Sequence, residues 1–206
     1  MIGTYLEQPF EGLLFRPLAH AFHIHRPGPA TLGQGSYGTL MLIRLLWDLL
    51  LWVGVCFFLK HPVTGFPIRA QRWARLLTTG LAIGALCHAD YDTGHLALGS
   101  ASIAPSGQTI AGALGNGSWW LVLDFLGALG EEILGRAVIL TTVEHFLGSR
   151  GAVLVSGIMF SGLHLDNPGA SPLWLLPLFL QGTVLAYAVF RTRSLWWSVG
   201  YHTGWN

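Results

Sequence analysis

Apolar positions dominate the chain from Gly38 onward and form long runs that short polar segments separate. A helix needs about 20 mostly apolar residues to cross a bilayer, and several of these runs approach that length. The pattern therefore predicts an all-α, multi-span transmembrane helical bundle of about six spans. The expected bounds of the spans are 38–59, 74–88, 119–147, 151–165, 172–190 and 194–206.

Polar residues gather in the remaining stretches. Residues 1–37 contain several Pro and Gly, and a short amphipathic piece there suits the membrane interface. His20, His23 and His25 match no zinc spacing, so we interpret them as solvated histidines. Residues 89–118 are rich in Gly, Ser and Ala, which favours a long polar loop.

Composition agrees with a membrane protein. The chain is 52% apolar and only 10% charged, whereas a soluble chain carries about 25% charge. A net charge of +1 provides no field that would recruit nucleic acid, so we expect the partners to be the lipid bilayer and a membrane-associated peptide or protein. Cys56 and Cys87 both fall in apolar spans, and we expect two free thiols.

Lys and Arg mark one end of the predicted spans. They occur in the connections between spans one and two, three and four, and five and six, and they are absent from 89–118. Because cytoplasmic loops carry an excess of basic residues, we expect these three connections in the cytoplasm and the N-terminus outside. The last segment, 194–206, has 13 residues, which is too short to cross, so we expect the chain to be truncated there.

The third predicted span carries two adjacent carboxylates and an arginine. Charges at membrane depth are costly and usually mark a functional site. Glu132 and Arg136 are four residues apart on one helix face, so they can form an ion pair. Glu131 points about 100° away and needs a partner from elsewhere in the chain. Arg44 and Asp48 in the first span are also four apart, and we expect them to neutralise each other.

Two later spans offer partners for Glu131. Phe160 and His164 share one face of the fourth span, and His202 and Asn206 share one face of the last. A carboxylate beside an imidazole can hold and deprotonate a water molecule. A second imidazole and an amide can stabilise a developing oxyanion, which together suits hydrolysis of an amide bond. The same residues would also serve a proton-coupled transporter, a non-catalytic membrane scaffold or a structural ion-pair network.

These residues resemble the three signature motifs of the CPBP intramembrane proteases, which include CAAX prenyl endopeptidases and bacteriocin-processing and self-immunity proteins. The motifs are EExxxR at 131–136, FxxxH at 160–164 and HxxxN at 202–206. The resemblance implies a four-helix catalytic core at 118–206, preceded by accessory transmembrane helices and a loop at 38–117. It implies an integral protein of the bacterial inner (plasma) membrane and leaves open whether the substrate is prenylated.

The resemblance also implies a role for each motif residue. Glu131 would be the general base, assisted by His164, while His202 and Asn206 would stabilise the oxyanion. The supporting residues are Glu132 and Arg136, which would brace the helix, and Phe160, which would pack the pocket. The enzyme would be glutamate- or metal-dependent: one Glu and two His match a zinc set as well as a water-activating pair. We expect no tightly bound metal, with a divalent metal such as zinc as the alternative.

Overall fold

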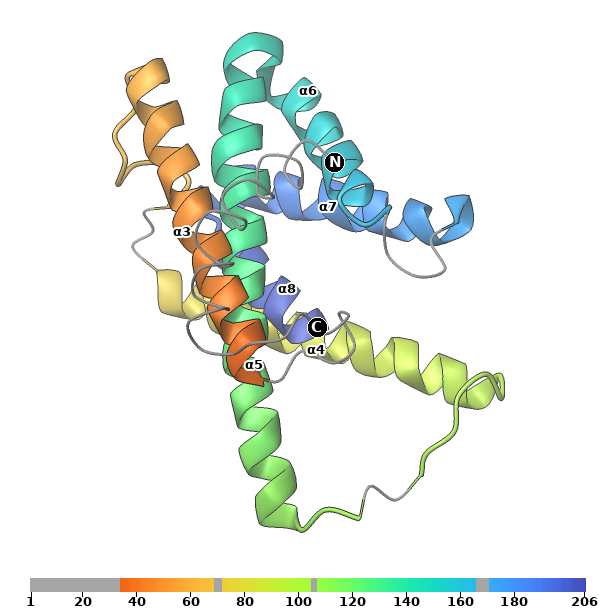
Figure 1. The fold of residues 1–206 in the computed structure, drawn as a ribbon. Coiled ribbons are helices and arrows are strands. Elements are labelled where there is room, and N and C mark those ends of the chain that lie inside the picture. Colours follow the sequence, from red (N-terminus) through yellow and green to blue (C-terminus); the bar gives the residue numbers. More distant parts are fainter. Residues whose placement is uncertain (1–33, 69–71, 105–106, 166–170) are drawn as a thin grey trace.

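The computed structural model describes residues 34–68, 72–104, 107–165 and 171–206. The predicted interfacial segment and its three histidines, His20, His23 and His25, lie outside these ranges. The described residues form helices and no strand, which confirms the all-α class (Figure 1). The elements are α3 (Gln34–Leu59), α4 (Trp73–Ala97), α5 (Ile110–Glu132), the π-helix η3 (Ile133–Ile139), α6 (Leu140–Gly162), α7 (Pro172–Thr192) and α8 (Trp196–Trp205).

Three helical stretches among the described residues are long and apolar enough to cross a membrane. They are Tyr37–Leu59, Ile110–Gly162 and Pro172–Thr192. The chain is therefore an integral membrane protein, although the structure does not confirm the predicted count of about six spans. α8 has 10 residues, too few to cross a bilayer by itself.

The predicted loop at 89–118 is largely helical, and that expectation is wrong. α4 continues to Ala97, and α5 already begins at Ile110. On α4, His88 Nε2 lies 3.4 Å from Asp92 Oδ2, an i,i+4 contact that supports the helix where the sequence appeared too polar for one. The start of α5 is capped by Thr109, whose side chain accepts a hydrogen bond from the Gly112 N–H.

The boundary predicted between the third and fourth spans is confirmed at Gly148. α5, η3 and the first part of α6 follow one another as one long helical arm, and the chain then reverses into the second arm of α6 (Figure 1). Gly148 has φ 71° and ψ 175°, backbone angles that favour glycine because it lacks a Cβ. α3 lies alongside the long arm and α7 packs against α6.

Two connections that contain basic residues lie together. The Arg193 guanidinium sits 4.8 Å from the centre of the Phe66 ring, and the Leu195 N–H donates to the Pro67 carbonyl at 2.9 Å. The indole of Trp196 donates to the Ile68 carbonyl at 2.8 Å. The connections after α3 and after α7 therefore share one side of the molecule, as the distribution of Lys and Arg predicted.

α4 and α8 pack through glycines at unusually close range. Gly80 and Gly84 of α4 face Gly200 and Gly204 of α8, and a Cβ added to any of the four would collide with the backbone of the other helix. Small residues spaced by four allow such an approach between membrane helices. Because α8 is short, this contact with α4 fixes the position of His202.

We predict that Gly84→Ala destabilises the protein by about 1–3 kcal/mol, since its methyl group would meet the Tyr201 carbonyl oxygen. Thermal unfolding of the detergent-solubilised protein measures the effect. Gly94→Ala on the same helix is the matched control, because nothing lies within 4 Å of its Cβ position. Equal melting temperatures for the two variants would refute the close packing of α4 on α8.

Candidate active site

The candidate site begins where α5 passes into the π-helical turn. Glu131 and Glu132 are the last residues of α5, and Arg136 lies in η3. Single π-helical turns inside longer helices are frequent at functional sites. Arg136 Nε lies 3.2 Å from Glu132 Oε2, which confirms the ion pair predicted from their spacing.

Arg136 connects this turn to the two helices behind it. Its side chain is 1% exposed, and its guanidinium lies 4.7 Å from the centre of the Phe160 ring on α6. Nη2 of Arg136 also donates to the Gly182 carbonyl of α7 at 3.4 Å. The arginine therefore holds Glu132 and ties α6 and α7 to the same point.

Glu131 finds partners on two other helices. Arg44 Nη1 of α3 lies 3.4 Å from Glu131 Oε1, and His202 Nε2 of α8 lies 3.7 Å from Glu131 Oε2. The sequence paired Arg44 with Asp48, so the contact with Glu131 was not predicted. Asp48 is fully buried and lies against Gly130, next to the two carboxylates.

His202 bridges the two carboxylates. Its Nδ1 lies 3.0 Å from Glu132 Oε1, and since an ionised carboxylate only accepts hydrogen bonds, Nδ1 is the donor. The edge of the ring faces Phe160, with 5.5 Å between the ring centres. One imidazole thus contacts both glutamates, and the histidine cannot shift without disturbing both.

Each of the two adjacent glutamates has an arginine partner. Arg44 lies beside Glu131, and Arg136 lies beside Glu132. Paired charges are tolerated at membrane depth, whereas a lone carboxylate there would be costly. The two glutamates differ in exposure: the Glu131 side chain is 21% exposed and that of Glu132 is 0%.

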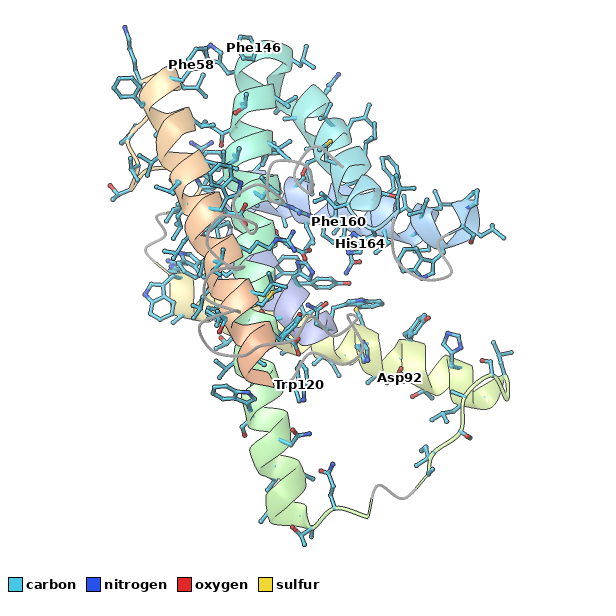
Figure 2. The ribbon with its side chains drawn as sticks, viewed as in Figure 1. Phe58, Asp92, Trp120, Phe146, Phe160 and His164 are labelled. Atoms are coloured by element: carbon cyan, nitrogen blue, oxygen red, sulfur yellow. The ribbon has the colours of Figure 1, made fainter. Side chains whose placement is uncertain are left out.

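His164 lies in the turn that directly follows α6, beside Phe160. Its Nδ1 is 2.8 Å from the Phe160 carbonyl, which only accepts, so Nδ1 carries the proton and Nε2 of the neutral ring is an acceptor. Its ring contacts Phe160 at 4.9 Å between centres, and Phe160 in turn contacts His202 at 5.5 Å between centres. Figure 2 shows Phe160 and His164 together at the end of α6 nearest the middle of the molecule.

The depth of His164 follows from the Gly148 turn. Glu131 is 17 residues before Gly148 and His164 is 16 residues after it, so the two arms bring them to similar depth. Both residues therefore belong to one site.

Asn206 is the predicted catalytic residue that the structure does not bring into the cluster. Its side chain is exposed and forms no hydrogen bond with another described residue, while its backbone N–H donates to the His202 carbonyl at 3.1 Å. The structure therefore gathers Glu131, His164 and His202, and leaves Asn206 at the end of α8.

In the ranges that the structure describes, no group of three or more His, Cys, Asp or Glu side chains is placed to hold a metal ion. Nδ1 of His202 is directed to Glu132, and Nδ1 of His164 is directed to the Phe160 carbonyl.

The site and the fold define an integral membrane protein with a buried glutamate–histidine cluster. Residues 114–206 match the family model described as type II CAAX prenyl endopeptidase Rce1-like. The match contains all three motifs and confirms the resemblance inferred from them. α3 with Arg44, and α4, precede the matched residues. No curated protein and no solved structure matches the chain.

We predict that Arg136→Met destabilises the protein by about 3–5 kcal/mol, because it leaves Glu132 buried without its cation. The melting temperature and the folded yield in detergent measure the loss. Arg150→Met, which removes an exposed arginine, should leave both unchanged. If the two variants behave alike, Arg136 does not brace the helix.

Proposed function

We propose that the protein is an intramembrane endopeptidase that hydrolyses a peptide bond in a membrane-tethered substrate, with water activated by Glu131. The observation that carries this proposal is the contrast between the two adjacent glutamates. Glu132 is fully buried and held by Arg136 and His202, whereas Glu131 is partly exposed beside two imidazoles. Only Glu131 combines access for water with neighbours that can assist proton transfer.

In the proposed reaction, Glu131 takes a proton from water as the oxygen attacks the scissile carbonyl carbon. His164 Nε2 is an acceptor and is proposed to orient that water. The amide C–N bond then breaks, and the leaving nitrogen receives the proton that Glu131 accepted. This use of one carboxylate as base and then as acid needs no protein nucleophile.

The residues proposed to stabilise the oxyanion lie on α8 and directly after it. When both ring nitrogens carry protons, Nε2–H of His202 can donate to the oxygen of the tetrahedral intermediate. Asn206, one turn further along α8, is proposed to add its amide N–H once substrate is bound. The α4–α8 contact would then set the position of both donors.

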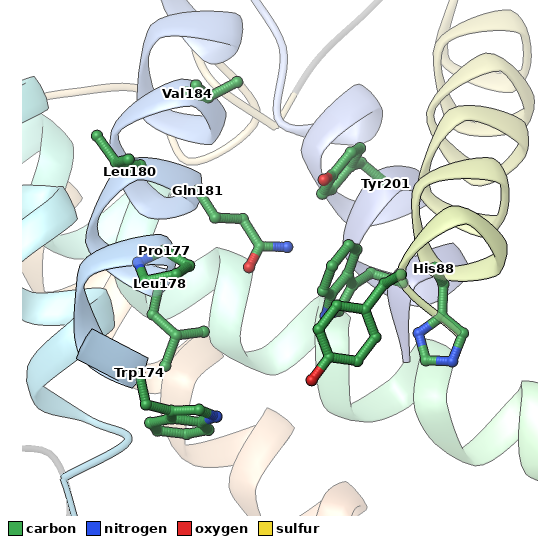
Figure 3. Close-up of a pocket in the computed structure, with 10 residues that line it drawn as sticks. His88, Trp174, Pro177, Leu178, Leu180, Gln181, Val184 and Tyr201 are labelled. Atoms are coloured by element: carbon green, nitrogen blue, oxygen red, sulfur yellow. The ribbon is translucent and has the colours of Figure 1, made fainter. Parts of the chain in front are cut away.

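A large cavity beside the site suits an apolar part of the substrate. It has a volume of about 520 Å³, and its lining is mostly apolar. Figure 3 shows Gln181 of α7 pointing across it toward Tyr201 of α8. Trp174 lines the cavity and lies 6.3 Å from His164 between ring centres, while Tyr201 precedes His202 in sequence. We propose that this cavity holds a lipid group or apolar side chains of the cleaved tail.

Location and orientation are part of the proposal. We propose that the protein resides in a bacterial inner (plasma) membrane with its N-terminus outside. The basic connections after α3 and after α7, which contact each other, would then face the cytoplasm.

We predict that Glu131→Gln lowers cleavage by at least about 10²-fold, because the amide has the size of the carboxylate but cannot act as a base. The measurement uses purified protein in vesicles with a fluorogenic peptide that carries a C-terminal prenylated cysteine motif. Asp90→Asn, which removes an exposed carboxylate on α4, should retain activity. Full cleavage by Glu131→Gln would contradict the proposed base; wild-type protein without cleavage would favour a scaffold or transporter.

We also propose that catalysis needs no bound metal, which the described donor set supports. A membrane-permeable chelator is therefore expected to leave cleavage unchanged, and elemental analysis of active protein should find less than one metal ion per chain. Loss of cleavage that added zinc restores would contradict this part of the proposal.

A further inference from the structure

A second cavity lies at the opposite end of α3 from the glutamate site. It is open to the surface, has a volume of about 350 Å³ and is lined by the end of α3, the connection that follows it and the first turns of α6. Its lining residues are Leu59, Lys60, His61, Pro62, Phe66, Thr141, Glu144 and His145. Arg44 of the glutamate site is 16 residues before Lys60, which is about 24 Å along a helix. This cavity is therefore separate from the glutamate site.

Two opposite charges line this cavity without pairing. Neither the Lys60 ammonium nor the Glu144 carboxylate forms an ion pair with another residue in the described part of the chain. The cavity therefore presents one cation and one anion to whatever enters it. In the described ranges no three ligating side chains gather, so this is not a metal site.

Thr141 adds a buried hydroxyl to the lining. The residue is 6% exposed, and its Oγ1 has no hydrogen-bond partner. Helical threonines commonly bond the carbonyl four residues earlier, as Thr142 does with Val138 at 2.6 Å. A buried polar group of this kind calls for a partner, and a ligand in the cavity would supply one.

The cavity lies at the boundary between apolar and polar membrane layers. The apolar stretch of α3 ends at Leu59 and Lys60 follows directly. Exposed rings flank the cavity: Phe58 on α3 is 72% exposed and Phe146 before the Gly148 turn is 64% exposed. Figure 2 shows Phe58 and Phe146 at the same end of the molecule. Large exposed rings of this kind belong in lipid, so the charged lining is level with the lipid head groups.

We propose that this cavity binds the head group of a phospholipid that carries both a phosphate and a primary ammonium, as phosphatidylethanolamine does. Lys60 would pair with the phosphate and Glu144 with the ammonium, while the Thr141 hydroxyl would donate to a phosphate oxygen. A choline head group has no N–H to give to Glu144, and a glycerol head group has no positive charge. The site therefore selects one lipid class among those of similar shape.

The test measures lipid binding to the purified, delipidated full chain in detergent by native mass spectrometry. Wild-type protein is expected to bind phosphatidylethanolamine at least tenfold more tightly than phosphatidylcholine or phosphatidylglycerol. Glu144→Gln should lose this preference, because it removes the carboxylate that pairs with the ammonium. Lys60→Gln should instead weaken the binding of all three lipids, because each of them carries the phosphate. The matched controls Asp90→Asn and Arg150→Gln, which change exposed charges elsewhere, should retain the wild-type preference.

Competition separates a head-group site from a simple anion site. Glycerophosphoethanolamine, which lacks acyl chains, should displace the lipid, whereas inorganic phosphate at the same concentration should not. Equal binding of the three lipids, an unchanged preference in Glu144→Gln, or displacement by inorganic phosphate would each overturn the proposal. Because the readout is binding, the result does not depend on peptidase activity.

Discussion

Two carboxylates on consecutive residues of one membrane helix constrain the rest of the structure, because each must be neutralised where water is scarce. Arg136 neutralises Glu132 from within the same helical arm, and Arg44 approaches Glu131 from α3. His202 lies between them on α8 and contacts both. The requirement for charge balance thus joins three segments distant in sequence.

The need to neutralise both carboxylates also gives Glu131 and Glu132 different roles. Glu132 lies between Arg136 and His202 and has no exposure, so it suits a fixed anchor for His202. The side chain of Glu131 retains partial exposure beside Arg44 and His202. Neighbouring side chains of one type can differ in function because their partners come from different directions. The glycine contact between α4 and α8 keeps that geometry in place.

Sequence predicts the local part of this arrangement. Helical spacing predicted the Glu132–Arg136 pair, the break between the apolar runs 119–147 and 151–165 predicted a boundary where the chain reverses at Gly148, and the motifs predicted the family match. Prediction from sequence failed where the partner of a side chain comes from a distant helix. Arg44 had a plausible local partner in Asp48, so its contact with Glu131 needed the fold.

Other differences between the predicted and the observed structure also have physical causes. The polar end of α4 resembled a loop because its side chains face outward, although i,i+4 contacts support a helix there. The glycines spaced by four on α4 and on α8 are typical of close packing between membrane helices. Only the fold shows that these two helices pack against each other. The roles of His164, His202 and Asn206 stay predictions, since geometry alone does not report chemistry.

The most direct test of the central claim is the coupling free energy between Glu131 and Arg44 in a double-mutant cycle. Unfolding free energies of wild type, Glu131→Gln, Arg44→Met and the double variant give this value. If the two charges neutralise each other across α3 and α5, the double variant will be more stable than the sum of the single effects predicts, by about 0.5–3 kcal/mol. Additive effects would show that the two charges do not interact and would contradict the account.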